Sequence, residues 1–237
     1  MAIQARVTSR GQPAPTIEEL GALDLFHGLP LHDLEAIQDV GNCLLFGRGE
    51  TIVAITQGTV MAYVLLEGRA SAYRFGPTGL KLEIERLSPG HLYLRACQDD
   101  ELDQQDVIEA VGAETRVLRL PAATIHALLA SRCSVGAALS AQGERQRSAL
   151  AQRLEDASLP IRVRLCRQLV RGERQDPGHL FTETQEEWSW RIHCQREEAN
   201  RAIRMLARNR TIEQQQAPRG IIVLDLVRLI EKEAFLC

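Results

Sequence analysis

The period of the hydrophobic positions changes twice along the chain, and each change predicts a different kind of structure. From Thr16 the apolar residues follow a helical period, with Thr16 placed as an N-cap and a break at Gly28 to Pro30. The sequence therefore predicts two short helices between Thr16 and Ile37, after a polar N-terminal tail.

Between Cys43 and Leu120 the helical period is replaced by short β-rich runs separated by glycine and proline turn signals. The clearest runs are Thr51 to Ile55, Ala62 to Leu66, Leu80 to Leu87, Val107 to Val111 and Thr115 to Leu120. Short runs at this spacing are typical of an antiparallel sandwich or barrel.

Beyond Pro121 the helical period returns, with a short helix to about Ala130 and a longer one over about 134–157. A narrow stripe on the longer helix holds Val135, Leu139, Gln142, Leu150 and Leu154, with Ala138, Ala141 and Ala149 beside it. The stripe favours pairing with a second helix, but Gln142 and Gln146 weaken it. The alternative is a helix that packs on its own sandwich.

Charge divides the chain near residue 159. The whole chain has a net charge of −3, whereas residues 159–237 hold 14 Arg and Lys against 11 Asp and Glu. Residues 191–210 concentrate the positive charge, with six arginines against Glu197 and Glu198. Such clustering is what contact with phosphates requires, although a solvated arginine-rich helix face has the same composition.

The segment 182–206 predicts two short helices with a tight connection. Thr182 or Thr184 can cap the first helix, whose inner face holds Trp188 and Ile192. After a turn at His193 and Cys194, Gln195 can cap a second helix. The inner side of that helix is Ala199, Ala202, Ile203 and Leu206. This outline is that of a helix-turn-helix.

The outer side of the second helix predicts DNA contact. Arg196, Glu197 and Arg201 are the expected base readers, because Arg donates to guanine and Glu accepts from cytosine in the major groove. Residues expected at the DNA backbone are Gln195, Asn200, Arg204, Arg208 and Arg219. Arg219 lies in a predicted wing whose strands are Thr211 to Gln214 and Gly220 to Leu224.

Cysteine usage and hydropathy indicate a reduced, non-membrane chain. The six cysteines contain no CxxC pair, and no apolar run approaches the length that crosses a bilayer. We expect a cytoplasmic protein without a metal site. No Walker loop, metal spacing or nucleophile-base order predicts an enzyme.

At this point the sequence resembles the superfamily of the cyclic-AMP receptor protein and the fumarate-nitrate regulator (CRP/FNR). The resemblance rests on TQEEWSWRIHCQREEANRAIRML and RGIIVLDLVRLI, with LFHGLP, MAYVLLEGRASAY, RLSPGHLY and LPIRVRLCRQL upstream. It implies an α+β fold with a cyclic-nucleotide-binding-like jelly roll in residues 1–133, a dimerisation helix and linker in 134–158, and a winged helix-turn-helix in 159–237. It also implies a homodimeric transcription regulator with DNA and RNA polymerase as partners.

The sequence departs from the family where effectors bind. The stretch 91–111 lacks the Gly-Glu and Arg-Ser pairs that hold cyclic AMP, and its acidic run would repel a phosphate. Arg95 is the only cation near this run, and we expect it at the surface. No cysteine precedes Cys43, which argues against the iron-sulfur cluster of fumarate-nitrate regulators.

Two effector alternatives and two local departures stay open. Haem could use His91, His126 or Cys97. A thiol switch could use Cys194, if Arg196 and the helix N-terminus lower its pKa. His193 replaces the usual turn glycine, and Trp190 falls on a different face from the buried Trp188. The competing function is a regulatory or sensor subunit that binds a small ligand or haem and no DNA.

Overall fold

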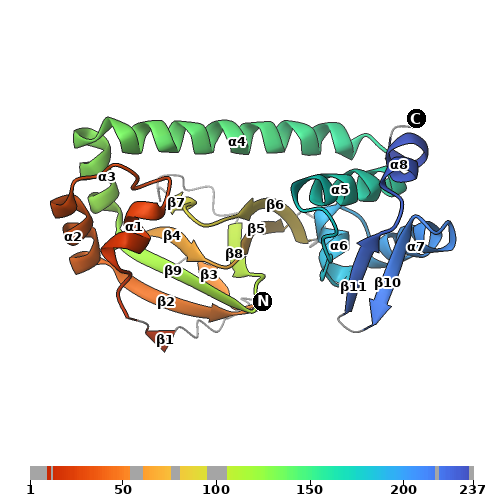
Figure 1. Cartoon of the computed structure of the whole chain (residues 1–237), viewed down its shortest axis with the longest axis horizontal. Coiled ribbons are helices and arrows are strands. Elements are labelled where there is room, and N and C mark those ends of the chain that lie inside the picture. Colours follow the sequence, from red (N-terminus) through yellow and green to blue (C-terminus); the bar gives the residue numbers. More distant parts are fainter. Residues whose placement is uncertain are drawn as a thin grey trace. The chain divides into compact units, whose positions relative to one another are not determined.

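The computed structural model describes residues 10–11, 13–53, 61–75, 81–94, 106–216 and 219–234. Contacts divide the chain into two compact units, residues 1–149 and 150–237. Figure 1 shows a β-rich N-terminal unit and a C-terminal unit of helices with one β-hairpin. Cys97 and Arg95, with most of the acidic run after them, lie outside the described residues.

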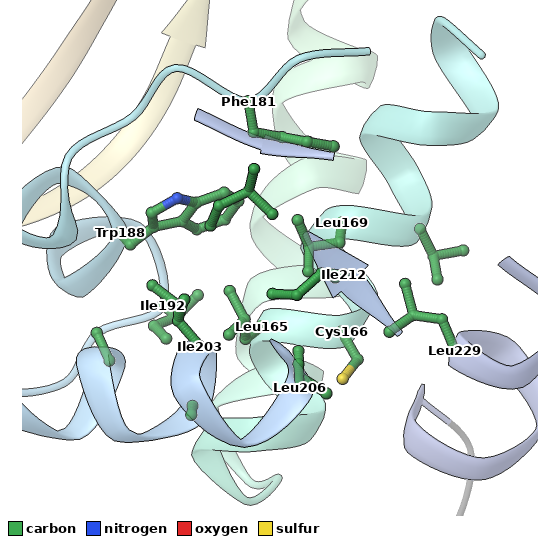
Figure 2. Close-up of a cluster of buried hydrophobic side chains, with 14 of the residues drawn as sticks. Leu165, Cys166, Leu169, Phe181, Trp188, Ile192, Ile203, Leu206, Ile212 and Leu229 are labelled. Atoms are coloured by element: carbon green, nitrogen blue, oxygen red, sulfur yellow. The ribbon is translucent and has the colours of Figure 1, made fainter. Parts of the chain in front are cut away.

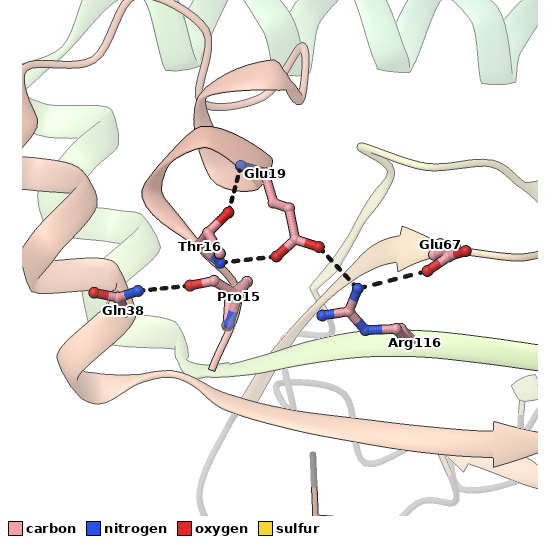
Figure 3. A network of polar contacts seen from close by, with 6 residues as sticks. All are labelled: Pro15, Thr16, Glu19, Gln38, Glu67 and Arg116. Atoms are coloured by element: carbon pink, nitrogen blue, oxygen red, sulfur yellow. Dashed lines mark hydrogen bonds and ion pairs between the residues drawn. The ribbon is translucent and has the colours of Figure 1, made fainter. Parts of the chain in front are cut away.

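The N-terminal helices are α1 (Ile17–Ala22) and α2 (Leu31–Val40), as the sequence predicted. Thr16 caps α1: its Oγ1 accepts the Glu19 N–H at 3.1 Å, and the Glu19 carboxylate accepts the Thr16 N–H at 2.8 Å. Figure 3 shows that the second oxygen of this carboxylate accepts a hydrogen bond from Arg116 Nη1, at 2.9 Å. Because Arg116 lies 97 residues further on, this contact ties α1 to the sheet behind it.

Two antiparallel sheets form the N-terminal unit. The strands are β1 (Arg10–Gly11), β2 (Asn42–Gly47), β3 (Thr51–Val53), β4 (Met61–Glu67), β5 (Ala70–Phe75), β6 (Lys81–Leu87), β7 (Leu92–Leu94), β8 (Asp106–Ala110) and β9 (Glu114–Pro121). One sheet has the order β1-β2-β9-β4-β7, and the other has the order β3-β8-β5-β6. The predicted antiparallel sandwich is therefore confirmed.

The core of the sandwich lies between the two sheets. Phe46 and Val117 from the five-stranded sheet pack with Ala72 and Ile108 from the four-stranded sheet, and all four are buried. Gly68 allows the tight β4–β5 turn, because its φ is +88° and a Cβ there would lie 2.4 Å from the Glu114 carbonyl oxygen.

Helices cover the outer face of the five-stranded sheet. Val64 and Leu118 on this face pack with Ile37 from α2 and with Phe26 from the turn between α1 and α2. Helix α3 (Ala122–Ser131) closes the same cluster through Ile125. The alternation along β9 sends Val117 into the sandwich and Leu118 toward the helices, as the period of a strand requires.

The long helix α4 spans Cys133–Ala157 and begins one residue before the predicted start. Its first half packs on the N-terminal unit, since Val135 is fully buried there. Gln142 and Gln146 also turn toward this unit, where they bond to Leu92 and Glu85. The predicted stripe is thus divided: Leu150 and Leu154 further along are 54% and 77% exposed.

The C-terminal unit has its own core. Its elements are α5 (Ile161–Gln175), α6 (Gln185–Arg191), α7 (Arg196–Arg208), β10 (Ile212–Gln216), β11 (Arg219–Val223), α8 (Leu226–Arg228) and a π-helical segment, Leu229–Ala234. Figure 2 shows the side chains that these elements bury together, with the Trp188 ring 5.8 Å from that of Phe181. The predicted helix-turn-helix and hairpin are present.

One boundary differs from what the sequence predicts. The pattern predicts a helix over about 161–170 followed by a polar loop at 172–179, but α5 continues to Gln175. Gly172 lies inside the helix against Phe181, where a Cβ would be 2.4 Å from the ring. The glycine signals close packing of the phenyl ring here and does not end the helix.

No single helix in the described ranges combines the length and apolar character needed to span a membrane, although the sharply bent pair α3 and α4 passes that test together.

Candidate nucleic-acid interface

A capping box sets the start of α6. Of the two threonines that the sequence offered, Thr184 is the cap: its Oγ1 accepts the Glu187 N–H at 3.2 Å, and Glu187 accepts the Thr184 N–H at 2.6 Å. Trp188 and Ile192 follow on the inner face and are buried. Trp190 is half-buried, so the different face it occupies is not fully open to solvent.

The turn between the two helices has the backbone that the sequence implied. His193 has φ +53°, in the left-handed region where glycine is the usual residue. After Cys194, Gln195 begins α7, and its N–H donates to the Glu198 carboxylate at 2.9 Å. This acidic group at the first turn satisfies one of the free N–H groups that every helix start carries.

Helix α7 has one buried side and one exposed side. The predicted inner residues Ala199, Ala202, Ile203 and Leu206 are all buried in the core of the C-terminal unit. The expected base readers Arg196, Glu197 and Arg201 are all exposed, as is the cap residue Gln195. Burial of the apolar side therefore fixes which side chains α7 presents to solvent.

A hollow of about 410 Å³ runs along the exposed side of α7. It is lined by Glu197, Asn200, Arg201, Arg204, Met205 and Arg208. Five residues that the sequence singled out are brought together here, and Arg196 stands at the start of the same helix.

The arginines on this side are available to a ligand. Within the described part of the chain, the guanidinium groups of Arg196, Arg201, Arg204 and Arg208 make no hydrogen bond or ion pair. The 13 residues of α7 carry four guanidinium groups against the two carboxylates of Glu197 and Glu198, so the helix has a net positive charge.

Arg219 lies elsewhere. It begins β11 and lines a separate hollow of about 400 Å³ with the three glutamines of β10 and with Thr184 and Gln185 at the start of α6. Arg219, the residue expected in the wing, therefore lies near the start of α6 and outside the hollow along α7.

Two residues that no sequence pattern marked, Met205 and Arg162, lie beside the hollow along α7. Met205 lines the hollow along α7, and its sulfur accepts a hydrogen bond from Arg162 Nη1 at 3.6 Å. Arg162 lies 43 residues earlier, in α5, so only the packing of α5 on α7 brings it here. No local sequence signal marks that contact.

The surroundings of the Cys194 thiol disfavour the thiol-switch alternative. Its side chain is buried, and burial together with the nearby Glu198 raises its pKa to about 11. The Sγ also donates to the Gln195 carbonyl at 3.3 Å. Desolvation outweighs the opposing effects of Arg164 and the Ala199 N–H here, so the thiol stays protonated and is a poor nucleophile.

The two histidines considered as haem ligands lie in different surroundings. His91 is partly buried, and its Nε2 lies 3.2 Å from Gln142 Nε2 and 3.4 Å from Gln146 Nε2. This nitrogen is engaged with protein groups. His126 is exposed on α3, and no group of three or more metal-binding side chains occurs among the described residues.

Both the sequence and the fold of this chain are similar to known proteins. Residues 163–232 match the family model of the Crp-like helix-turn-helix domain. No curated protein matches the sequence significantly. The fold is similar to a CRP/FNR-family transcriptional regulator from Eubacterium rectale, with a TM-score of 0.69, 17% identity, and 87% of this chain and 95% of that chain covered.

Two further structures have the same fold at low identity. FixK2 from Bradyrhizobium japonicum matches with a TM-score of 0.67, 14% identity, and 84% of this chain and 100% of that chain covered. The regulator CLP from Xanthomonas campestris has a TM-score of 0.67, 14% identity, and coverages of 82% and 99%. Residues 163–232 are therefore a Crp-like helix-turn-helix domain, and the chain has the fold of the CRP/FNR family of transcriptional regulators.

Proposed function

We propose that this protein is a homodimeric, sequence-specific DNA-binding transcription regulator whose helix α7 enters the major groove. The observation that carries the proposal is the division of α7: its apolar side is locked in the core, and its exposed side presents four arginines that have no partner in the described chain. An arginine without an internal partner can bond to bases without first breaking a contact within the protein.

The exposed side divides by position along the helix. Arg196, Glu197 and Arg201 lie in its first two turns and are the proposed base readers. Arg204 and Arg208, nearer its end, are proposed to contact phosphates together with Gln195, Asn200 and Arg219. Base contacts would discriminate by about 1–3 kcal/mol each, whereas phosphate contacts position the protein on any sequence.

The exposed part of α4 supports dimerisation. Leu150 and Leu154 are 54% and 77% exposed. Large apolar side chains that lie exposed together indicate a surface that another protein covers. Gly136 and Gly143 precede Leu150 at seven-residue intervals, and a Cβ at either glycine would meet nothing within 4 Å. A second α4 could approach closely along this face, as in a heptad-based helix pair.

A dimer would give the two recognition helices a defined spacing. Successive major grooves on one side of DNA lie about 34 Å apart, so two α7 helices held at that distance would bind a palindromic site. The N-terminal sandwich would adjust this spacing in response to a signal, or hold it constant without one.

We propose an effector other than cyclic AMP. The stretch 91–111 lacks the paired residues that hold a cyclic phosphate and carries several carboxylates instead. Proteins of this fold respond to different molecules: CLP is described as responsive to cyclic di-GMP. An unidentified small effector, or DNA binding without one, fits this chain best.

The remaining proposals follow from the role of a regulator. The protein would act in the cytoplasm, contact RNA polymerase at promoters and catalyse no reaction. Its function would lie in binding alone.

Selection from random duplex DNA tests the proposal. We expect the full-length protein to enrich a palindromic site, with an affinity that falls steeply as salt rises. The variant Arg201→Gln should lose the enriched site, while Arg174→Gln, which removes an exposed arginine from the last turn of α5, should keep it. If no site is enriched, the competing role as a sensor subunit that binds no DNA is favoured.

A further inference from the structure

The guanidinium of Arg164 bonds to four carbonyl oxygens from two different parts of the C-terminal unit. Its Nε donates to Leu159 at 2.8 Å, its Nη2 to Ala157 at 2.7 Å, and its Nη1 to Ile192 and His193 at 3.2 Å each. All three nitrogens of the guanidinium are therefore used, in the fork geometry that only arginine offers.

The first two carbonyls belong to the end of α4 and the corner after it. Ala157 is the last residue of α4, and Leu159 lies between α4 and α5. Carbonyls in the last turn of a helix have no partner within the helix. A cation that donates to them satisfies these groups and interacts favourably with the negative end of the helix dipole.

The other two carbonyls belong to the turn that precedes the recognition helix. Ile192 and His193 connect α6 to α7, and His193 holds a left-handed backbone with φ +53°. A non-glycine residue in this conformation costs about 1–2 kcal/mol, so the turn needs support from its surroundings. Arg164 supplies that support, because it donates to the carbonyl that precedes the strained residue His193 and to the carbonyl of His193 itself.

A second contact holds the end of α4 against α5. The Asp156 side chain is 7% exposed, and its two oxygens pair with Arg167 at 3.0 Å and Arg171 at 2.7 Å. Together with the hydrogen bonds of Arg164, these two ion pairs hold residues 156–160, which connect α4 to α5, in place.

We infer that Arg164 is a positioning residue that joins the end of α4 to the turn before α7, so that both keep one relative geometry when DNA is read. The inference rests on the proposed function for its consequence in DNA binding, but the junction itself is a property of the C-terminal unit. A change at the end of α4 would reach the recognition helix through this guanidinium.

Hydrogen exchange of the full-length protein tests the junction directly. Arg164→Lys keeps the charge but cannot bond to four carbonyls in a plane. We expect amides around 157–161 and the Cys194 amide, which donates to Ser189, to exchange about tenfold faster, the loss expected for broken charge-assisted hydrogen bonds. Amides of the β10–β11 hairpin should be unchanged, and Arg174→Gln should match the wild type throughout.

Two exchange results would overturn the inference. One is wild-type exchange at both segments in Arg164→Lys. The other is an equal increase at every amide of residues 159–234, which would mean that Arg164 only stabilises the whole unit.

DNA binding provides the second arm. Arg164→Lys should bind the selected site about tenfold more weakly, with the same dependence of affinity on salt, because no phosphate contact is removed. In Arg164→Gln, which removes the charge, a salt slope smaller by about one would instead identify Arg164 as a phosphate contact and contradict the inference. If the wild type selects no DNA site, the proposed function fails while the exchange result still decides the role of Arg164.

Discussion

The side-chain amide of Gln142 pairs with both backbone groups of Leu92. Its Oε1 accepts the Leu92 N–H at 3.0 Å, and its Nε2 donates to the Leu92 carbonyl at 2.8 Å. Leu92 begins β7, the edge strand of the five-stranded sheet, so the glutamine of α4 takes the place of a neighbouring strand. A residue that weakens an apolar stripe in the sequence thus has a specific role on the inner face of α4.

Removing this pair should loosen α4 from the sandwich. Gln142→Ala leaves the N–H and carbonyl of Leu92 without a partner in a partly buried place, which should lower the free energy of unfolding by about 2 kcal/mol. Urea unfolding measures this, with Gln152→Ala, an exposed site on the same helix, as the control. Equal stabilities of the two variants would show that the pair contributes nothing.

The stability of the N-terminal unit should fall in acid through His91. Burial, with a smaller contribution from Arg145, lowers the pKa of His91 to about 4 from an ordinary value of 6.5. The unfolded chain therefore binds the proton more readily than the folded chain. The contribution of neutral His91 to stability is complete above about pH 6.5 and is lost as the pH falls toward 4, by about 3 kcal/mol in all.

The His91→Gln variant isolates this effect. The Nε2 of His91 faces Gln142, Gln146 and, at 3.7 Å, Glu85, and a glutamine keeps a polar group there without titrating near neutral pH. The difference in unfolding free energy between wild type and variant should change between pH 6.5 and 4. A difference independent of pH would refute the assignment.

The strained turn offers a stabilising substitution. At φ +53°, His193→Gly removes the steric penalty of a Cβ and should raise the free energy of unfolding of the C-terminal unit by about 0.5–1 kcal/mol, after the entropy cost of glycine. His193→Ala is the matched control, since it removes the ring and keeps the Cβ. Thermal denaturation of both variants checks the prediction, and no gain for glycine over alanine would contradict it.

The exposed leucines of α4 predict the oligomeric state. Leu154→Glu places a charge on the proposed dimer face, where a second copy would have to bury it, and should convert the dimer to a monomer. Gln152→Glu adds the same charge on the opposite side of the helix and should leave the dimer intact. Light scattering after size-exclusion chromatography gives the mass of each. A dimer in both variants would place the interface elsewhere.

Sequence periodicity was sufficient for the elements but not for their exact contacts. The β-rich run from Thr115 to Leu120 and the cap at Thr16 are local signals, and the sequence predicts both. The continuation of α5 through Gly172 was not, because the glycine accommodates a ring from a distant residue, Phe181.

For the candidate site, too, some features could be predicted from the sequence and others could not. The exposed side of α7 follows from helical spacing, since burial of one side determines the other. The pKa of Cys194 does not follow from its neighbours in sequence, because burial opposes them, and the four contacts of Arg164 join segments that only tertiary packing brings together.

The most direct test of the central claim compares Arg196→Ala with Arg208→Ala on the selected DNA site and on each of its single-base variants. Arg196 lies at the start of α7 and should read one base, so its loss should abolish about 1–3 kcal/mol of discrimination at one position per half-site and leave the others unchanged. Arg208, at the end of the helix, should weaken binding to all sequences equally and reduce the salt slope by about one. Equal losses for both variants on every sequence would contradict the account, because neither arginine would then be reading bases.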